Sequence, residues 1–357
     1  MTHLFTPGPV PVPAFVMEAI ARPVIHHRTE AFTTLYAGIQ TRLQYLFQTK
    51  GFTGTIIGSG TYGVESAIYS LFRPGEKVAV IQVGKFSQRW SDYSKLSGLE
   101  IIVIEKEWGK GITPQEVSSQ LESHSDIAGI VITHCETSTG VCLDLEEIVL
   151  AARQQFPDLC ILVDAITTVG AIPFYMDQWE IDYAVVASQK ALMNPAGTCA
   201  FALSERAMGR LVSTHSSDFR NLYNYYQSGK RHEYPFTAPT QLLYGIGAAL
   251  EDIQSEGLPA IWNRTHHAAK TFREGIIKLD GEIVAEMPSD SLTAFRFPGK
   301  NNSFIKKQMA EKYDIHLAGG QGPMKGEIMR CSHMAGMDAE MMLMVLDKLG
   351  ELVKQKE

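Results

Sequence analysis

Seven short apolar runs between residues 55 and 203 constrain the fold of this chain more than any other feature. They carry apolar residues at consecutive positions, as strands do when helices cover both faces of their sheet, whereas a half-exposed strand would alternate. Stretches of helical spacing separate them, at 63–72, 113–123 and 143–155. The alternation predicts an α/β fold with a mostly parallel central sheet. The runs cover residues 55–57, 78–82, 101–104, 129–133, 161–163, 184–187 and 199–203.

The chain has 357 residues, which is long for one domain and suggests two. Four prolines lie within residues 5–13, so residues 1–15 are predicted to form an extended arm. Residues 16–240 would form the large domain. After residue 240 the pattern changes to long amphipathic helices, short strands and a terminal helix. We therefore expect residues 241–357 to supply an interdomain helix and a smaller α+β domain.

Composition limits the partners and the location of the protein. The 32 Lys and Arg against 39 Asp and Glu give a formal net charge of −7, so there is no general positive field to bind nucleic acid or an anionic membrane. No apolar stretch approaches the ~20 residues of a membrane-spanning helix. The five cysteines lack a C-x-x-C pair and the N-terminus does not resemble a signal peptide. We expect a cytoplasmic protein with free thiols.

The segment Gly58-Ser-Gly-Thr-Tyr-Gly63 lies between an apolar run and a predicted helix. Glycines let backbone N–H groups approach an anion, and a helix N-terminus adds partial positive charge, so phosphate binding is expected there. The alternative is an ordinary tight turn. The string also matches the G-x-G-x-x-G dinucleotide pattern, but the next strand ends in Gln82-Val-Gly84 without the acidic residue that would bind a ribose. A phosphate without a ribose fits better.

Two charged residues directly follow later apolar runs, where ligands bind in sheets of this kind. Asp164 follows buried aliphatic residues, so its carboxylate needs a partner to stay charged. A protonated ring nitrogen is one candidate partner, and the alternative is that Asp164 caps the next helix. Lys190 would be partly desolvated, which lowers its pKa and makes its amine a nucleophile, unless it is a surface lysine in a loop. A phosphate cradle, an acid for a pyridinium and a lysine for a Schiff base are together what pyridoxal phosphate requires.

Several motifs recur together in the order and at the separations of one known family. The chain resembles the class V aminotransferases, pyridoxal-phosphate-dependent enzymes of fold type I, over essentially its whole length, and the alanine–glyoxylate and serine–glyoxylate group most closely. The motifs are Thr6-Pro-Gly-Pro9, Gly58-Ser-Gly-Thr61, Thr133-His-Cys-Glu-Thr-Ser-Thr-Gly-Val141, Val163-Asp164, Ser188-Gln-Lys-Ala-Leu192 and Met329-Arg330.

The resemblance implies roles for particular residues. Lys190 would form the Schiff base with the cofactor and carry the proton between the substrate Cα and the cofactor C4′. Asp164 would keep the pyridine nitrogen protonated. Further cofactor contacts would be Ser59, Gly60, Thr61 and Gln189 at the phosphate, Phe86 stacked on the ring, Thr137 near the phenolic oxygen, and Ile166. No metal site is expected, because the histidines and cysteines lack H-E-x-x-H and C-x-x-C spacing. Cys135 is interpreted as a packing residue.

The resemblance also implies an obligate homodimer with shared active sites. Tyr234 and Thr237 match a pair that family members donate to the cofactor phosphate of the neighbouring subunit. Each site would therefore be incomplete in a single chain.

The expected reaction is transamination between an amino acid such as alanine or serine and a 2-oxo acid such as glyoxylate, pyruvate or 2-oxoglutarate. Arg330 would bind the substrate α-carboxylate through its planar fork. His27 and Arg28 resemble a pair that receives a substrate phosphate in phosphoserine aminotransferases, but a similar pair occurs in the glyoxylate group. Phosphoserine or aminoethylphosphonate therefore stays open as the donor. A cysteine desulfurase, a nicotinamide-dependent oxidoreductase and a non-catalytic binding protein are weaker alternatives.

Overall fold

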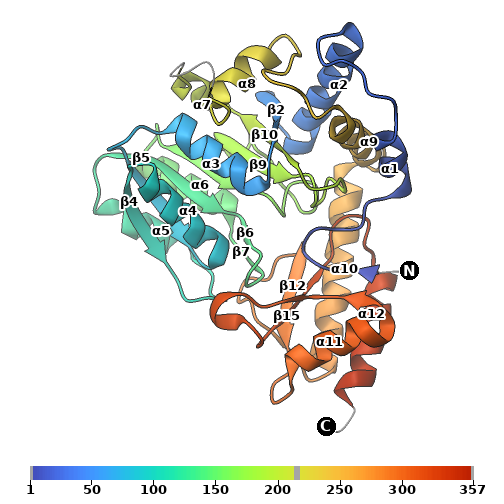
Figure 1. Ribbon diagram of the computed structural model, residues 1–357. Coiled ribbons are helices and arrows are strands. Elements are labelled where there is room, and N and C mark those ends of the chain that lie inside the picture. Colours follow the sequence, from blue (N-terminus) through green and yellow to red (C-terminus); the bar gives the residue numbers. More distant parts are fainter. Residues whose placement is uncertain (1–2, 213–217, 355–357) are drawn as a thin grey trace.

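The structure is a computed structural model that describes residues 3–212 and 218–354 (Figure 1). A seven-stranded sheet occupies its larger part, in the order β2-β10-β9-β8-β5-β3-β4. Strand β10 runs antiparallel to both of its neighbours and all other pairs are parallel, which confirms the predicted mostly parallel sheet. The strands are β2 (Phe52–Ile57), β3 (Lys77–Gln82), β4 (Glu100–Glu105), β5 (Ile127–Thr133), β8 (Cys160–Asp164), β9 (Tyr183–Ala187) and β10 (Thr198–Leu203).

Every residue of β8, β9 and β10 is buried, so the middle of the sheet is covered on both faces. This two-sided burial explains why the sequence runs do not alternate between apolar and polar residues. A two-stranded hairpin, β6 (Cys135–Glu136) with β7 (Val141–Cys142), follows β5. The helices of this part are α1 (Ala14–Ile20), α2 (Glu30–Phe47), α3 (Gly60–Leu71), α4 (Lys85–Leu96), α5 (Pro114–Glu122), α6 (Leu145–Gln155), α7 (Glu205–Arg210), α8 (Leu222–Gly229) and α9 (Thr240–Glu256).

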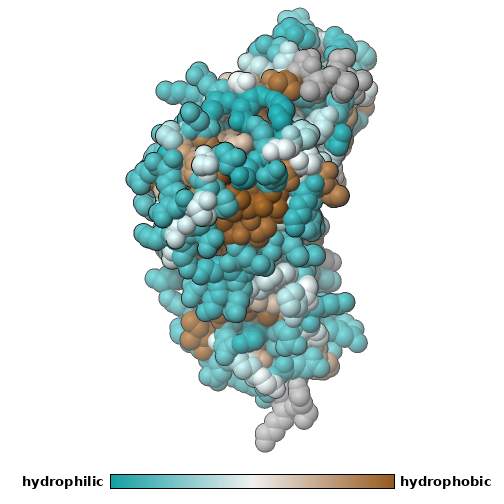
Figure 2. All heavy atoms as spheres, turned by 90° about the vertical axis from the view of Figure 1, so that its left-hand side faces the viewer, coloured by the Kyte–Doolittle hydropathy of each residue, from teal (hydrophilic) through white to brown (hydrophobic). Residues whose placement is uncertain are grey.

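Strand β4 is the outer strand at one edge of the sheet. Its side chains are less covered than those of the central strands: Ile101 and Ile102 are half-buried and Val103 is 36% exposed. Figure 2 shows the side of the molecule on which β4 lies, with an apolar patch surrounded by polar residues. Charged residues stand at both ends of the strand, Glu100 and Glu105.

The C-terminal part has its own sheet and its own hydrophobic core. The sheet is antiparallel, in the order β11-β12-β15-β14. Helices α10 and α12 pack against each other beside it, in the lower half of Figure 1. The elements are α10 (Leu258–Lys278), β11 (Glu282–Ile283), β12 (Leu292–Arg296), α11 (Asn302–Tyr313), β13 (Ile315–His316), β14 (Ala318–Gly319), a 3₁₀ turn (Gly322–Met324), β15 (Met329–Ser332) and α12 (Ala339–Val353).

The N-terminal segment passes between these two parts (Figure 1). Strand β1 (His3–Leu4) pairs in parallel with β13, and the chain then has no helix until Ala14. Phe5 is buried in the core of the C-terminal part, whereas Val10 is buried in the core around the large sheet. The arm therefore packs against both parts.

Candidate active site

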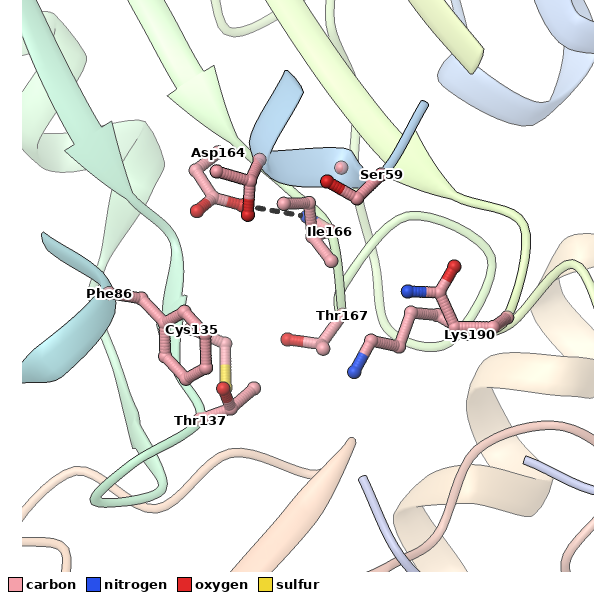
Figure 3. A pocket seen from close by; sticks show the side chains of 11 residues that line it. Ser59, Phe86, Cys135, Thr137, Asp164, Ile166, Thr167 and Lys190 are labelled. Carbon is pink, nitrogen blue, oxygen red and sulfur yellow. Dashed lines mark hydrogen bonds between the residues drawn. The ribbon is translucent and has the colours of Figure 1, made fainter. Parts of the chain in front are cut away.

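A cavity opens at the carboxyl ends of the strands of the large sheet (Figure 3). Each wall comes from a different connection: the turn after β2, the start of α4, the β6–β7 hairpin, the segment after β8 and the turn after β9. Parallel strands bring these connections to one edge, so residues far apart in sequence meet there. The lining residues are Ser59, Gly60, Thr61, Phe86, Cys135, Thr137, Asp164, Ile166, Thr167, Gln189 and Lys190.

Lys190 projects its amine into the cavity from the turn after β9 (Figure 3). Burial, together with the positive charge of Arg330, lowers its pKa to about 8. The Nζ atom donates a hydrogen bond to the carbonyl oxygen of Pro7 in the N-terminal arm. Near neutral pH a larger fraction of this amine is thus unprotonated than in an ordinary lysine, and the direction of the pKa shift is the one that the sequence predicts.

Asp164 is the last residue of β8, on another wall of the cavity. Its carboxylate accepts hydrogen bonds from the backbone N–H of Ile166 at 3.1 Å and from the indole N–H of Trp90 at 3.0 Å. Burial nevertheless raises its pKa to about 7. The next element after Asp164 is β9, so the helix-capping alternative is wrong. A buried carboxyl group with this pKa is suited to a cationic partner such as a protonated ring nitrogen.

Ser59, Gly60 and Thr61 form the N-terminal end of α3. Ser59 is the N-cap residue, and its hydroxyl accepts from the N–H of Tyr62 at 3.4 Å. A Cβ on Gly60 would lie 2.6 Å from Ile166 Cδ1, so a larger residue at this position would displace the Ile166 side chain that lines the cavity. Beside them, the side-chain oxygen of Gln189 is buried without a hydrogen-bond partner among the described residues. The site thus offers the N–H groups of a helix N-terminus as donors to a phosphate group. Gln189 can add a donor only through its amide NH₂ group, because its oxygen is an acceptor.

Phe86 faces the cavity from the first turn of α4 (Figure 3). Its backbone N–H and that of Ser87 each donate to the Glu136 carboxylate at 3.0 Å. Glu136 is fully buried and also accepts from the hydroxyls of Ser87 and Ser138, at 2.9 and 2.6 Å. This carboxylate therefore fixes the start of α4 and with it the position of Phe86.

Arg330 is placed beside the cavity by β15. Its Nη1 donates to the carbonyl oxygen of Thr137 at 2.7 Å and its Nε to that of Gly319 at 2.9 Å. Among the described residues Nη2 has no hydrogen-bond partner, and the side chain is close enough to Lys190 to lower its pKa. One end of the guanidinium is thus available for an anion near Lys190.

Five predicted site residues lie outside the cavity lining: Arg330, which stands beside it, and the four residues His27, Arg28, Tyr234 and Thr237. Arg28 donates to the backbone carbonyl of Tyr234 at 3.0 Å, and the neighbouring His27 is half-buried. The Tyr234 side chain is fully buried, in contact with the rings of Tyr36 and Tyr225, while Thr237 is exposed. To reach a neighbouring subunit, as the sequence predicts, the Tyr234 hydroxyl would have to leave this aromatic cluster.

Several residues of the site were not predicted from the sequence. Cys135, interpreted as packing, is buried and also lines the cavity together with Thr167. Trp90 donates to Asp164, and Glu136 supports Phe86. Both contacts join segments more than 45 positions apart, so no local pattern in the sequence indicates them. Glu136 could have been singled out only as the acidic residue of the motif at 133–141.

A mostly parallel sheet with a nucleophilic lysine, a buried carboxyl group and a phosphate-type cradle at one edge is the arrangement of a pyridoxal-phosphate enzyme. The comparison with protein families agrees: the model of the class V aminotransferases matches residues 14–338. The chain belongs to this family. The predicted fold type, cofactor and enzyme class are thereby confirmed, and the oxidoreductase and binding-protein alternatives are wrong.

Individual relatives cover nearly the whole chain. It is 32% identical over 336 residues to a protein of Synechococcus sp. named soluble hydrogenase, small subunit. The alignment covers 93% of this chain and 87% of the relative. It is 31% identical over 353 residues to the L-aspartate–glyoxylate aminotransferase of Paracoccus denitrificans, with 95% and 88% covered. The solved structure of an aspartate aminotransferase of subgroup IV from Thermus thermophilus is similar with a TM-score of 0.92, at 30% identity and 99% coverage of both chains.

Two further observations concern the described residues 3–212 and 218–354. No helix within them combines the length and apolar character needed to cross a bilayer. Nor do any three His, Cys, Asp or Glu side chains come together there as metal ligands would.

Proposed function

We propose that this aminotransferase transfers the amino group of an α-amino acid to glyoxylate or a related 2-oxo acid, with Lys190 as the residue that attaches covalently to the cofactor. The observation that carries the proposal is the placement of Lys190 and Asp164 on separate walls of one cavity, at the N-terminal end of α3. When bound, pyridoxal phosphate supplies an electron sink for the carbon from which the substrate proton is removed.

The residues of this chain would then divide the work. Asp164 holds a proton on the ring nitrogen, for which its buried carboxylate is the counter-charge. Lys190 moves the proton between the substrate Cα and the cofactor C4′, because its lowered pKa lets it act as a base and then as an acid near neutral pH. Phe86 and Ile166 enclose the ring, and Thr137 contacts its phenolic oxygen. Ser59, Gly60, Thr61 and Gln189 hold the phosphate.

Arg330 would bind the substrate α-carboxylate with the end of its guanidinium that no described residue occupies. Glyoxylate as acceptor is supported by the name of the Paracoccus relative, and aspartate as donor by that name and by the Thermus structure. Alanine and serine remain donors to compare. We do not carry the hydrogenase name of the Synechococcus relative over to this chain, because the proposal depends on Lys190 and Asp164 in the cavity.

The alternative of phosphoserine depended on His27 and Arg28. Neither residue lines the cavity, and Arg28 is bonded to the Tyr234 carbonyl. We therefore favour aspartate, alanine and serine as donors over phosphoserine and aminoethylphosphonate. Assembly into a homodimer, in which Tyr234 and Thr237 would serve the partner's phosphate, stays part of the proposal, as do the division at residues 15 and 240 and a cytoplasmic location.

The first test is whether Lys190 attaches to the cofactor. The purified protein should be yellow and should lose its visible absorption band on borohydride reduction, with the modification mapped to Lys190 by mass spectrometry. Lys190→Ala should abolish transamination while the far-ultraviolet circular dichroism is retained, and Lys50→Ala, at an exposed position, should be active. Transamination retained by Lys190→Ala would assign the role to another lysine.

The second test is a donor panel. Conversion of the aldehyde form of the cofactor to the amine form would be followed by absorbance with aspartate, alanine, serine, glutamate, phosphoserine and aminoethylphosphonate. We expect reaction with one or more of aspartate, alanine, serine and glutamate, and weak reaction with phosphoserine and aminoethylphosphonate. Reaction with phosphoserine or aminoethylphosphonate alone would overturn the proposed donor class, and His27→Ala and Arg28→Ala would then show which residue recognises the phosphate.

A further inference from the structure

Arg89 lies directly behind the phosphate cradle, on the first turns of α4. Its Nη1 donates a hydrogen bond to the hydroxyl oxygen of Thr61 at 2.8 Å. Its guanidinium carbon is 5.3 Å from the centre of the Phe86 ring. One side chain thus contacts the cradle and the aromatic wall of the cavity together.

The charges around the cavity leave a phosphate group poorly balanced. Lys190 is the one cationic side chain among the lining residues, and in the proposed function its amine is used at the aldehyde end of the cofactor. Ser59, Thr61 and Gln189 are neutral, and a helix N-terminus contributes only about half a charge. A phosphate ester carries about −1.5 to −2 near neutral pH, and burying it without a cation is costly.

We propose that Arg89 is the positioning residue that supplies this missing positive charge, acting on the cofactor phosphate through the Thr61 hydroxyl. A hydroxyl that accepts a hydrogen bond from a guanidinium can still donate its own proton, and the donated bond is strengthened by the charge behind it. Arginine is suited to the role because its several donors let it bond Thr61 while its guanidinium carbon lies over the Phe86 ring. The inference rests on the proposed function, since it takes the N-terminal end of α3 as the phosphate site.

A purely structural role is the competing explanation, in which Arg89 only supports the Phe86 ring. The two roles differ in what they do to ligands with and without a phosphate. Loss of the cation that balances the phosphate charge would weaken the binding of pyridoxal phosphate but not that of pyridoxal. Loss of support for the Phe86 ring would weaken the binding of both ligands.

The test is equilibrium binding to apoprotein, followed by quenching of tryptophan fluorescence, with pyridoxal phosphate and pyridoxal as probes. Arg89→Gln should weaken binding of pyridoxal phosphate by about 10- to 100-fold, as expected for a bond to a charged group. It should change binding of pyridoxal less than twofold. Arg89→Lys should restore part of the loss. The matched control is Arg220→Gln, which removes a guanidinium that lies 4.3 Å from the Tyr69 ring, outside the cavity lining.

Thr61→Val provides an independent variant, in which the relay hydroxyl is lost and Arg89 stays. It should weaken pyridoxal phosphate selectively, and combining it with Arg89→Gln should add little, because both changes remove one linked interaction. Equal weakening of both probes by Arg89→Gln, no weakening of either, or full additivity would overturn the inference. If the unaltered apoprotein binds no pyridoxal phosphate, the proposed function itself fails, which is a distinguishable outcome.

Discussion

Asp164 holds a carboxyl group in a site that disfavours its charge until a cation binds. Burial raises its pKa from 3.8 to about 7 in the protein alone. Between these values the folded apoprotein keeps a proton that the unfolded chain releases. The stability of the apoprotein should therefore fall as the pH rises from about 4 to about 7, which is opposite to the usual effect of a salt-bridged aspartate.

The direction of this pH dependence gives a prediction for the stability of the Asp164→Asn variant. The variant lacks the titrating group, so its apoprotein should gain stability over the unaltered apoprotein on going from pH 5 to pH 7.5, by roughly 1–3 kcal/mol. Urea unfolding at the two pH values measures the difference, and Asp158→Asn, at an exposed position, is the control. Equal pH dependence in the Asp164→Asn and unaltered apoproteins would contradict the assignment.

At the level of single residues, the sequence predicted the groups that stand directly after buried strands. Lys190, Asp164, Gly60 and Phe86 all line the cavity, because the end of an apolar run marks the edge of the sheet. Contacts between distant connections were not predictable in this way. Trp90 reaches Asp164 from the second turn of α4, and nothing in the sequence next to either residue specifies that pairing.

Among the elements, α4 has an unusual start. Its N-cap position is Gly84, which has no side chain, and the Glu136 carboxylate from the β6–β7 hairpin bonds the first N–H groups instead. A cap supplied by another element ties the orientation of the helix to the hairpin. The Glu136 carboxylate therefore fixes Phe86 and Arg89, which are on α4, relative to Thr137 in the hairpin.

Glu136→Gln should expose how much of the site depends on this cap. An amide in place of the carboxylate turns an NH₂ group toward the same donors and removes the charge that balances the helix end, which should cost roughly 2–3 kcal/mol of unfolding free energy. Urea denaturation measures the loss, and fluorescence titration should show weaker binding of pyridoxal as well as pyridoxal phosphate. Glu105→Gln, at an exposed position of β4, should change stability by less than about 0.5 kcal/mol. A stable Glu136→Gln variant with normal cofactor affinity would show that the hairpin does not position α4.

The elements themselves were largely predictable. All seven apolar runs are strands, and the helices at 63–72, 113–123 and 143–155 differ from the observed α3, α5 and α6 by at most three residues at any end. Helix α4 and the short strands β6 and β7 were not predicted. The buried face of α4 consists of Trp90 and three serines, so few apolar residues mark it in the sequence. Strands β6 and β7 have two residues each and are too short to show a period.

In the whole molecule, the N-terminal arm joins the two hydrophobic cores across the cavity. Phe5 is buried in the C-terminal core, Val10 lies in the core of the large sheet, and the Pro7 carbonyl between them accepts from Lys190. A Cβ at Gly8 would overlap the end of the Lys190 side chain, so the arm runs directly against the Lys190 amine. The sequence predicted an extended arm from its prolines, but its contact with Lys190 depends on how the two parts pack.

Phe5→Ala should loosen this connection. Removing a fully packed phenylalanine ring from the C-terminal core should lower the unfolding free energy by roughly 3–5 kcal/mol. Urea unfolding monitored by circular dichroism gives the value, and Phe304→Ala, at a ring that is 52% exposed, serves as the control. Similar losses in the two variants would argue that the arm adds little to the packing.

The course of the arm also sets an order of events during synthesis of the protein. Residues 3–10 emerge from the ribosome before any of their partners exist, since β1 pairs with Ile315 and His316, and the Phe5 carbonyl accepts from the backbone N–H of Ser332. At about 5–20 residues per second, these partners follow tens of seconds later. The large sheet and its lysine can form first, but the arm cannot make these contacts until residues 315–332 have been translated. The wall that the arm adds beside Lys190 is thus completed only after β13 and β15 have been synthesised.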